Sequence, residues 1–202
     1  GQGCKSFNIA ADEATLGNVK YDSTETAFVN YVNDLNTYIK SKGMTTRMFC
    51  DGVKSTDKVD KDIVILYWQA QSPNAQSFAD AGYQVVNMSA NAGLYYAYVG
   101  NRSSWWVWNQ DVTQIYNSWN PSIVCRDCDN SSTYTVKDTV TSDKLLGAAF
   151  AMWTDYAHVD GRSGNYLIEK DTNSVVEKIQ VVGDRCWENA STASYTTWTS
   201  GL

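Results

Sequence analysis

Apolar side chains alternate with polar or small ones near the start of the chain and then recur at helical spacing. Phe7 and Ile9 alternate with polar neighbours, which predicts a short buried strand. The next apolar positions lie three or four residues apart and predict an amphipathic helix; they are Phe28, Val32, Leu35 and Ile39. Asp22–Glu25 has the pattern of a capping box before this helix, and Gly43 follows it.

The rest of the chain continues to alternate between short apolar runs and helical patterns. Residues 63–68 form an unbroken apolar run, which is typical of a strand covered on both faces. Further strands are predicted at 45–50, 83–88 and 145–153, and further helices at 75–81, 111–119 and 175–186. We expect an aromatic loop at 94–98, an irregular polar insertion at 125–142 and a polar tail at the end.

About five alternations of strand and helix are typical of a parallel (β/α) barrel of the TIM type or of an open doubly wound sheet. No Gly-x-Gly-x-x-Gly motif follows a strand, so a dinucleotide-binding fold has no support. The barrel is favoured because the residues of chemical interest fall at predicted strand C-termini, where barrels carry their active sites. These residues are Asp12, Glu13, Asp51, Trp68, Trp153 and Asp155. We therefore predict the α/β class and one barrel domain over residues 1–202.

The adjacent carboxylates of Asp12 and Glu13 are the strongest candidates for chemistry. On an extended backbone, adjacent side chains point to opposite sides, so one carboxyl can be held neutral while the other stays ionised. This separation suits general acid and base catalysis. The alternative interpretation is that the pair is the polar start of a loop or a helix cap.

Composition and charge narrow the classes of function. The net charge of −6, with no basic cluster, argues against nucleic acid as a partner. No apolar run of membrane-spanning length exists, and neither end resembles a signal peptide. Thirteen Tyr and eight Trp suit the stacking of aromatic faces on sugar rings, although most aromatic residues in any protein pack in its core. The surface rich in Asn, Ser and Thr suits a secreted bacterial protein.

The five cysteines are an odd number, and two of them have the spacing Cys-x-x-Cys at Cys125 and Cys128. This spacing occurs in zinc knuckles and redox pairs, but the chain has one His and no second pair to complete a four-ligand site. A local disulfide or separate thiols are favoured over zinc. We predict no metal site.

Several short motifs occur in the order and spacing of one glycosidase family. The stretch Phe-Asn-Ile-Ala-Ala-Asp-Glu-Ala at 7–14 resembles the acid-pair signature of glycoside hydrolase family 20, the β-N-acetylhexosaminidases and lacto-N-biosidases. Met-Phe-Cys-Asp-Gly at 48–52 and Tyr-Trp at 67–68 resemble the ends of its next two strands. Trp-Thr-Asp at 153–155 is similar to its final Trp-x-Glu with a shorter acid, as in lacto-N-biosidases. The resemblance covers about residues 5–190.

The resemblance implies retaining hydrolysis in which the substrate's own 2-acetamido oxygen attacks the anomeric carbon. It implies that Glu13 is the general acid and base and that Asp12 orients the acetamido N–H. A tyrosine, Tyr95 or Tyr96, would donate a hydrogen bond to the acetamido oxygen. The remaining implied substrate-binding residues are Trp68 and Trp153 as pocket walls, Asp155 for sugar hydroxyls, and Asp51. The implied partner is a GlcNAc-containing oligosaccharide or glycoconjugate, with no cofactor.

The resemblance covers only about the last five β/α units of an eight-stranded barrel. The first three units, with an Arg that binds the sugar, would precede Gly1. We therefore expect the chain to be a fragment of a longer protein, with two alternatives. It either pairs with the missing N-terminal barrel half or a second copy, or it is an inactive barrel remnant. As a fragment, the isolated chain is expected to be inactive.

Two other functions stay open at this point. A non-catalytic carbohydrate-binding module would use the tryptophans as stacking platforms. A glycosidase with an enzyme nucleophile would use Asp51 or Asp155 as the partner of Glu13 and would form a covalent glycosyl-enzyme.

Overall fold

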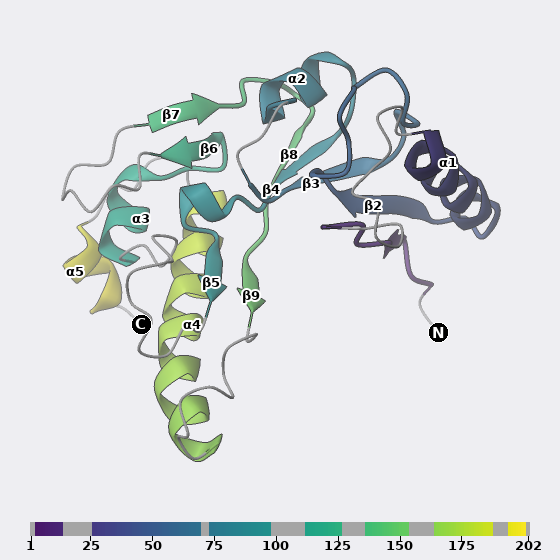
Figure 1. Cartoon of the computed structure of the whole chain (residues 1–202). Coiled ribbons are helices and arrows are strands. Elements are labelled where there is room, and N and C mark those ends of the chain that lie inside the picture. Colours follow the sequence, from purple (N-terminus) through teal and green to yellow (C-terminus); the bar gives the residue numbers. More distant parts are fainter. Residues whose placement is uncertain are drawn as a thin grey trace. The chain divides into compact units, whose positions relative to one another are not determined.

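The computed structural model describes residues 3–13, 26–69, 73–97, 112–126, 136–153, 164–187 and 194–200. The chain divides into two compact units, coloured by sequence in Figure 1. Unit 1 comprises Gly1–Asn87 and Thr139–Leu146, and unit 2 comprises Met88–Asp138 and Gly147–Leu202.

Unit 1 is built on a parallel sheet. Its first four strands are β1 (Ser6–Asn8), β2 (Thr45–Phe49), β3 (Val64–Tyr67) and β4 (Val85–Asn87), paired in that order. The strand β8 (Leu145–Ala148) completes a sheet of order β1-β2-β3-β4-β8. Connections between parallel strands place all four C-terminal ends at one edge, as in a barrel. The α/β class predicted from the sequence is confirmed, and the sheet is consistent with a partial α/β barrel.

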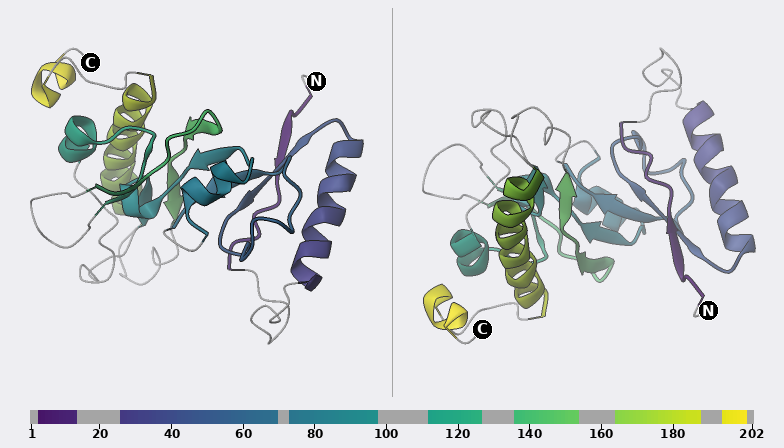
Figure 2. Two further views of the ribbon diagram at one scale, coloured as in Figure 1. Left: turned by 90° about the horizontal axis from the view of Figure 1, so that it is seen from above. Right: turned by 90° about the horizontal axis from the view of Figure 1, so that it is seen from below.

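Two helices of the described ranges pack against this sheet. The helix α1 (Thr26–Ser41) packs against β2 (Figures 1 and 2). It buries Phe28, Val32 and Ile39 of the predicted apolar stripe. The shorter helix α2 (Ala75–Asp80) packs against β4. Asn74 begins α2, because its side chain accepts a hydrogen bond from the Ser77 N–H at 2.8 Å. Both helices match the sequence prediction.

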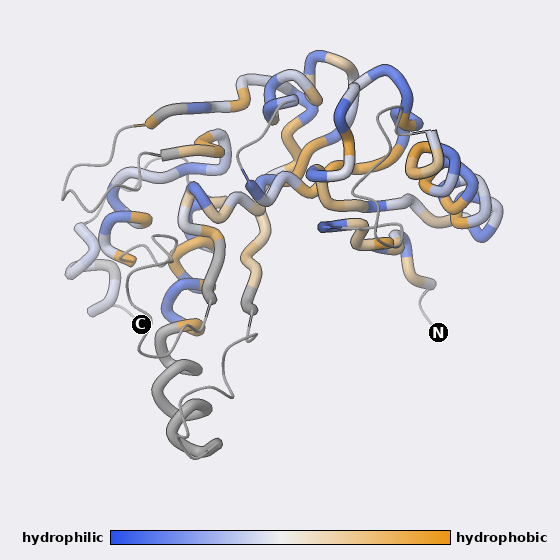
Figure 3. The backbone as a smooth tube through the Cα atoms, viewed as in Figure 1, coloured by the Kyte–Doolittle hydropathy of each residue, from blue (hydrophilic) through white to orange (hydrophobic). Residues whose placement is uncertain are grey.

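The core of unit 1 is centred on β3, and most of this strand has the colour of hydrophobic residues in Figure 3. All four of its side chains are buried, as the unbroken apolar run predicts. Met48 from β2 and Val85 from β4 are buried beside it. The strand β1 differs, because two of its three residues are exposed and Phe7 keeps 52% of its surface. The predicted burial of this strand is wrong: β1 pairs only with β2 among the described residues, and its outer edge is open.

The connection from β2 to β3 contains no helix and is ordered by polar contacts instead. Asn33 of α1 accepts a hydrogen bond from the Asp60 N–H and donates one to the Lys58 carbonyl. The buried Asn36 donates to the carboxylates of Asp60 and Asp62. These contacts attach the connection to α1, so the segment that follows β2 has a defined position.

The described residues of unit 2 form two small sheets, one 3₁₀ helix and three α-helices. The strand β5 (Tyr95–Ala97) pairs in parallel with β9 (Ala151–Trp153), and β6 (Ile123–Arg126) pairs with β7 (Val136–Thr139). The 3₁₀ helix η1 spans Ala90–Ala92, and the α-helices are α3 (Val112–Ser118), α4 (Gly164–Trp187) and α5 (Tyr195–Thr199). A second hydrophobic core forms around the fully buried Trp119, with residues from η1, α3, β6 and α4.

Three sequence predictions fail in unit 2 and at its boundary, and the tail contains a helix for which no prediction was made. The segment 145–153 is two strands in two sheets, and Leu146 is exposed rather than buried. The predicted loop at 94–98 contains β5, because β9 from far along the chain pairs with it. The predicted irregular insertion at 125–142 begins inside β6 and contains β7. The polar tail contains α5, whose Tyr195 packs on Tyr116.

Candidate active site

The acid pair lies in a tight turn directly after β1. The strand pairing with β2 continues past Asn8, because the Ile9 N–H donates to the Arg47 carbonyl and the Phe49 N–H donates to the Ala10 carbonyl. The backbone then leaves the strand through left-handed conformations, with φ of 58° at Ala10 and 65° at Ala11. The Asn8 side chain stabilises this exit by accepting a hydrogen bond from the Ala10 N–H at 2.9 Å.

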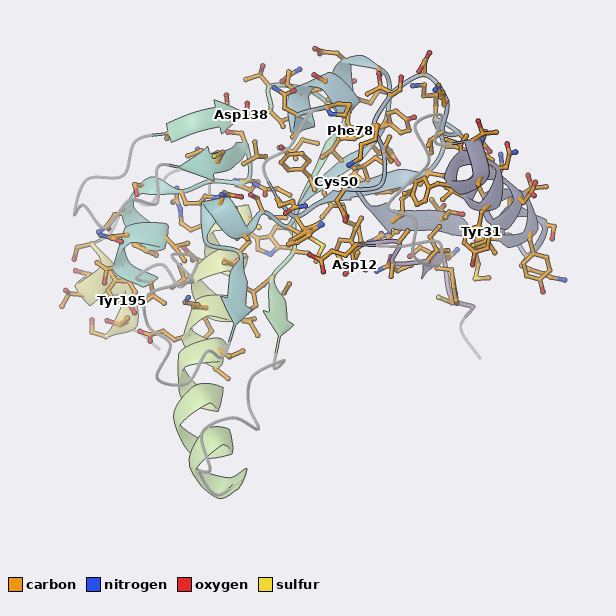
Figure 4. All side chains as sticks on the ribbon, in the orientation of Figure 1. Asp12, Tyr31, Cys50, Phe78, Asp138 and Tyr195 are labelled. Atoms are coloured by element: carbon orange, nitrogen blue, oxygen red, sulfur yellow. The ribbon has the colours of Figure 1, made fainter. Side chains whose placement is uncertain are left out.

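Asp12 is half-buried and Glu13 is exposed. Glu13 has a φ of 46°, so the two acids occupy a turn and not an extended strand. We predicted that the two side chains point to opposite sides because the backbone is extended. The backbone is not extended at Glu13, so the basis of this prediction is wrong. Figure 4 labels Asp12 and also Cys50, which follows the C-terminal end of β2. Carboxylates beyond the C-terminal ends of parallel strands have the placement of catalytic acids in barrels.

Asp51 connects the two neighbouring strand ends to the acid pair. One carboxylate oxygen, Oδ2, accepts a hydrogen bond from the backbone N–H of Glu13 at 2.5 Å. The other, Oδ1, accepts one from the indole Nε1–H of Trp68 at 2.9 Å. Asp51 is 6% exposed, so these bonds form in a largely dehydrated place. The structure thus brings together Glu13, Asp51 and Trp68 from the ends of three consecutive strands.

The residues around Asp51 hold it in place. Cys50 before it is fully buried, and the ring of Phe28 from α1 packs against the backbone of Gly52 after it. Lys54 donates from Nζ to the Asp51 carbonyl at 2.5 Å. Burial raises the pKa of the Cys50 thiol to about 12, so this side chain is a neutral thiol at physiological pH.

The other predicted site residues belong to unit 2 or lie outside the described residues. Tyr95 and Tyr96 are in β5, and Trp153 ends β9. The register places Tyr95 opposite Ala151 and Ala97 opposite Trp153, so the backbones of these candidates are neighbours within one small sheet. Asp155 lies outside the described residues. The roles assigned to these four residues stay predictions.

Two features of this site were missed in the sequence. Asn8 was not selected, although an Asn two residues before a turn commonly accepts a hydrogen bond from the backbone N–H. The contacts of Asp51 were missed as well, although its position after a strand was recognised. No short motif predicts that a carboxylate 38 residues away binds the amide of Glu13.

Among the described residues, no group of His, Cys, Asp and Glu could hold a metal ion. Cys125 is in β6, and Cys128 lies outside the described residues, so the Cys-x-x-Cys spacing is not tested. None of the described helices combines the length and the hydropathy that crossing a membrane requires.

The fold and the site together define a class: a partial α/β barrel with an acid pair and a supporting carboxylate at the C-terminal ends of parallel strands. The model of the glycosyl hydrolase family 20 catalytic domain matches residues 8–167. The chain therefore belongs to glycosyl hydrolase family 20. It is also 26% identical over 199 residues to a lacto-N-biosidase of Bifidobacterium bifidum, covering 96% of this chain and 16% of that protein.

Solved structures agree on the fold. Dispersin B superposes with a TM-score of 0.64 at 20% identity, over 91% of this chain and 54% of that one. A catalytic module of the pneumococcal exo-β-D-N-acetylglucosaminidase superposes with a TM-score of 0.57 at 19% identity, over 90% of this chain and 43% of that one. A β-N-acetylhexosaminidase of Bacteroides fragilis superposes with a TM-score of 0.55 at 14% identity, over 86% of this chain and 32% of that one. The chain thus spans about half or less of the proteins that it matches.

Proposed function

We propose that the chain is the C-terminal part of a catalytic barrel that removes β-linked GlcNAc or lacto-N-biose from glycans. The observation that carries this proposal is the placement of Asp12 and Glu13 after β1, with the Glu13 amide fixed by Asp51. The family supports a glycosidase, and the lacto-N-biosidase relative supports lacto-N-biose as the product.

The proposed reaction is retaining hydrolysis assisted by the substrate. The 2-acetamido oxygen of the substrate attacks the anomeric carbon while Glu13 protonates the leaving oxygen, and an oxazolinium intermediate forms. Glu13 then removes a proton from the water that opens this intermediate. Asp12 accepts a hydrogen bond from the acetamido N–H and stabilises the positive charge. The exposure of Glu13 suits this role, because the acid must reach both the leaving group and water.

The remaining residues would form the sugar pocket. Tyr95 or Tyr96 donates to the acetamido oxygen, and Trp68 and Trp153 form walls against the sugar ring and its acetyl group. Asp155 binds sugar hydroxyls. Of these residues, Trp68 has support from its contact with Asp51, which is itself bonded to the Glu13 amide.

The contacts of Asp51 favour this route over a covalent one. An attacking carboxylate must reach the anomeric carbon, but the Asp51 side chain is buried and its two oxygens are directed at the Glu13 N–H and the Trp68 indole. A covalent route through Asp155 predicts cleavage of substrates that lack the acetamido group. Substrate assistance predicts no such cleavage.

Hydrolysis of aryl-β-GlcNAc and aryl-β-lacto-N-bioside tests the proposal. The 202-residue chain and a longer protein with the preceding barrel segment are assayed together, each with its Glu13→Gln variant. We expect turnover by the longer protein and a loss of at least about 1,000-fold in Glu13→Gln with sugar binding retained. A folded longer protein that binds these sugars without turnover would instead support a carbohydrate-binding module.

We further propose that the preceding barrel segment docks on the open edge of unit 1. A groove of about 470 Å³ runs between β1 and α1, and aromatic residues on its border are exposed. Its lining includes Phe7, Tyr31, Leu35, Tyr38 and Met44. A parallel strand added beside β1, with an apolar helix in this groove, would cover both the strand edge and the aromatic side chains.

Hydrogen exchange of residues 5–9 tests this docking. We expect slower exchange in the longer protein than in the 202-residue chain, because the edge amides of β1 gain partners. Equal rates would contradict it. Protection in the short chain that increases with concentration would assign the groove to a second copy instead.

The proposed location is outside a bacterial cell or at its surface. The relatives that name an organism come from bacteria, and substrates of this class are glycans and glycoconjugates. Detection of the longer protein in culture medium or on intact cells by antibody tests this location.

A further inference from the structure

We propose that Asp51 is a positioning residue that fixes the backbone of Glu13 and the indole of Trp68, and that it is not a sugar ligand. Its effect on catalysis rests on the hydrolase function proposed above. Its effect on the geometry of the site does not, because that geometry can be measured without turnover.

The two oxygens of Asp51 are both used within the protein. Oδ2 accepts from the Glu13 N–H at 2.5 Å, and Oδ1 accepts from the Trp68 indole at 2.9 Å. With 6% of its surface exposed, the side chain has little access to a sugar hydroxyl. It is bonded instead to the backbone of one proposed catalytic residue and to the side chain of one proposed pocket wall.

The turn that carries Glu13 needs such a contact. Three of its residues, Ala10, Ala11 and Glu13, have φ between 46° and 65°, where side chains other than glycine are strained. Strained conformations persist only where surrounding contacts fix them. Within the described part of the chain, packing supplies little of this support, because Ala10 and Glu13 are exposed. The hydrogen bonds that the Ala10 N–H donates to Asn8 Oδ1 and the Glu13 N–H donates to Asp51 Oδ2 therefore fix this turn.

Asp51 can hold the turn because its own position is fixed. Cys50 and Gly52 on either side are buried, and Phe28 packs on the Gly52 backbone. The following connection is attached to α1 through Asn33 and Asn36. Asp51 follows the well-packed strand β2, and its side chain thus holds the exposed turn after β1 in a fixed position.

A carboxylate is the side chain that this arrangement requires. Both neighbours are donors, and ionised Asp presents two acceptor oxygens on a short side chain. Asn has the same shape but one acceptor and one donor group, so it can satisfy either Glu13 or Trp68 and not both. The Asp51→Asn substitution therefore tests the proposal with almost no change in volume.

The first measurement is amide and indole hydrogen exchange by NMR in the 202-residue chain. We expect exchange at the Glu13 amide, the Trp68 indole or both to accelerate at least about 10-fold in Asp51→Asn. The matched control is Asp57→Asn, which makes the same chemical change at an exposed carboxylate in the same connection. Unchanged exchange at both positions in Asp51→Asn would overturn the proposal.

The second measurement separates positioning from sugar binding in the longer protein. A misplaced acid lowers kcat, so we expect Asp51→Asn to lose about 10- to 100-fold in kcat with KM changed less than about 3-fold. The effects of Asp51→Asn and Trp68→Phe on kcat should be non-additive, because Asp51 is hydrogen-bonded both to Trp68 and to the backbone of Glu13. A large rise in KM at unchanged kcat would make Asp51 a sugar ligand. If the wild-type protein shows no turnover, the hydrolase function fails, and the exchange rates still decide the positioning role.

Discussion

β1 and β3 are strands of the same parallel sheet, but their surroundings differ. All four side chains of β3 are buried, whereas β1 pairs only with β2 among the described residues and exposes Phe7. The candidate acids follow the exposed strand, and Trp68 follows the buried one. Apolar packing holds the end of β3 in place, and hydrogen bonds hold the end of β1.

This difference shows how unit 1 orders a site on a strand with little packing. Asp51 connects the two strand ends, because its carboxylate accepts hydrogen bonds from Glu13 after β1 and from Trp68 after β3. Stability and site geometry in unit 1 should therefore respond to different substitutions. Core changes should affect stability most, and changes at the turn should affect geometry with small stability effects.

The largest effect is expected for Ile65→Ala in β3. Ile65 is fully buried at the centre of the sheet, and its truncation should lower the free energy of unfolding by about 2–5 kcal/mol. Urea denaturation followed by circular dichroism measures this loss. Phe7→Ala in β1 is the control and should cost less than about 1 kcal/mol. Equal losses would show that β1 is packed as tightly as β3.

The next effect is a loss of stability in alkali through Cys50. Burial raises its folded-state pKa to about 12, above the value near 9 of an exposed thiol. Between these values the unfolded chain loses the proton and the folded chain keeps it, so stability falls as pH rises. From pH 9 to 11 we expect a loss of about 2–3 kcal/mol attributable to this residue.

The Cys50→Ala variant isolates this contribution. Burial also raises the pKa of Tyr83 to about 12, with Asp57 and Asp60 acting in the same direction. Tyr83 contributes equally in wild type and in Cys50→Ala, so the difference between their profiles of stability against pH is caused by Cys50. Parallel profiles for wild type and Cys50→Ala would rule out the role of the thiol.

A somewhat smaller effect is expected for Gly52→Ala beside Asp51. A Cβ at this position would overlap Cζ of the buried Phe28 ring, so the ring or the backbone must shift. We expect a loss of about 1–3 kcal/mol in thermal or urea unfolding. Gly183→Ala in α4 meets nothing within 4 Å and should not destabilise. A loss in both variants would point to a general effect of replacing glycine.

The smallest effect should have the opposite sign. Ala11 has a φ of 65°, and a left-handed backbone costs a non-glycine residue about 1–2 kcal/mol. Gly removes this cost, but it loses more conformational entropy on folding than Ala does, which offsets part of the gain. Ala11→Gly should therefore raise stability by about 0.5–1 kcal/mol. Ala27→Gly in the first turn of α1 is the control and should lower stability by up to about 1 kcal/mol. If both variants lose stability, the turn is not strained.

Much of unit 1 could be predicted from sequence because its signals are local. The helical spacing of Phe28, Val32 and Ile39 predicted α1, and the apolar run at 63–68 predicted β3. Predictions failed where a distant segment decides the structure. The segment 145–153 divides because β8 joins one sheet and β9 pairs with β5, and no local pattern indicates either partner. The exposure of Phe7 likewise depends on which elements cover β1.

The sequence by itself determined the α/β class, the family motifs and the positions of Asp12, Glu13, Asp51 and Trp68 after strands. These follow from short-range periodicity and from residues close together in the chain. Only the tertiary structure decided that the acids occupy a left-handed turn and that Asp51 binds the Glu13 amide and the Trp68 indole. Such hydrogen bonds join segments 38 and 17 residues apart, so they exist only after parallel pairing has aligned the strand ends.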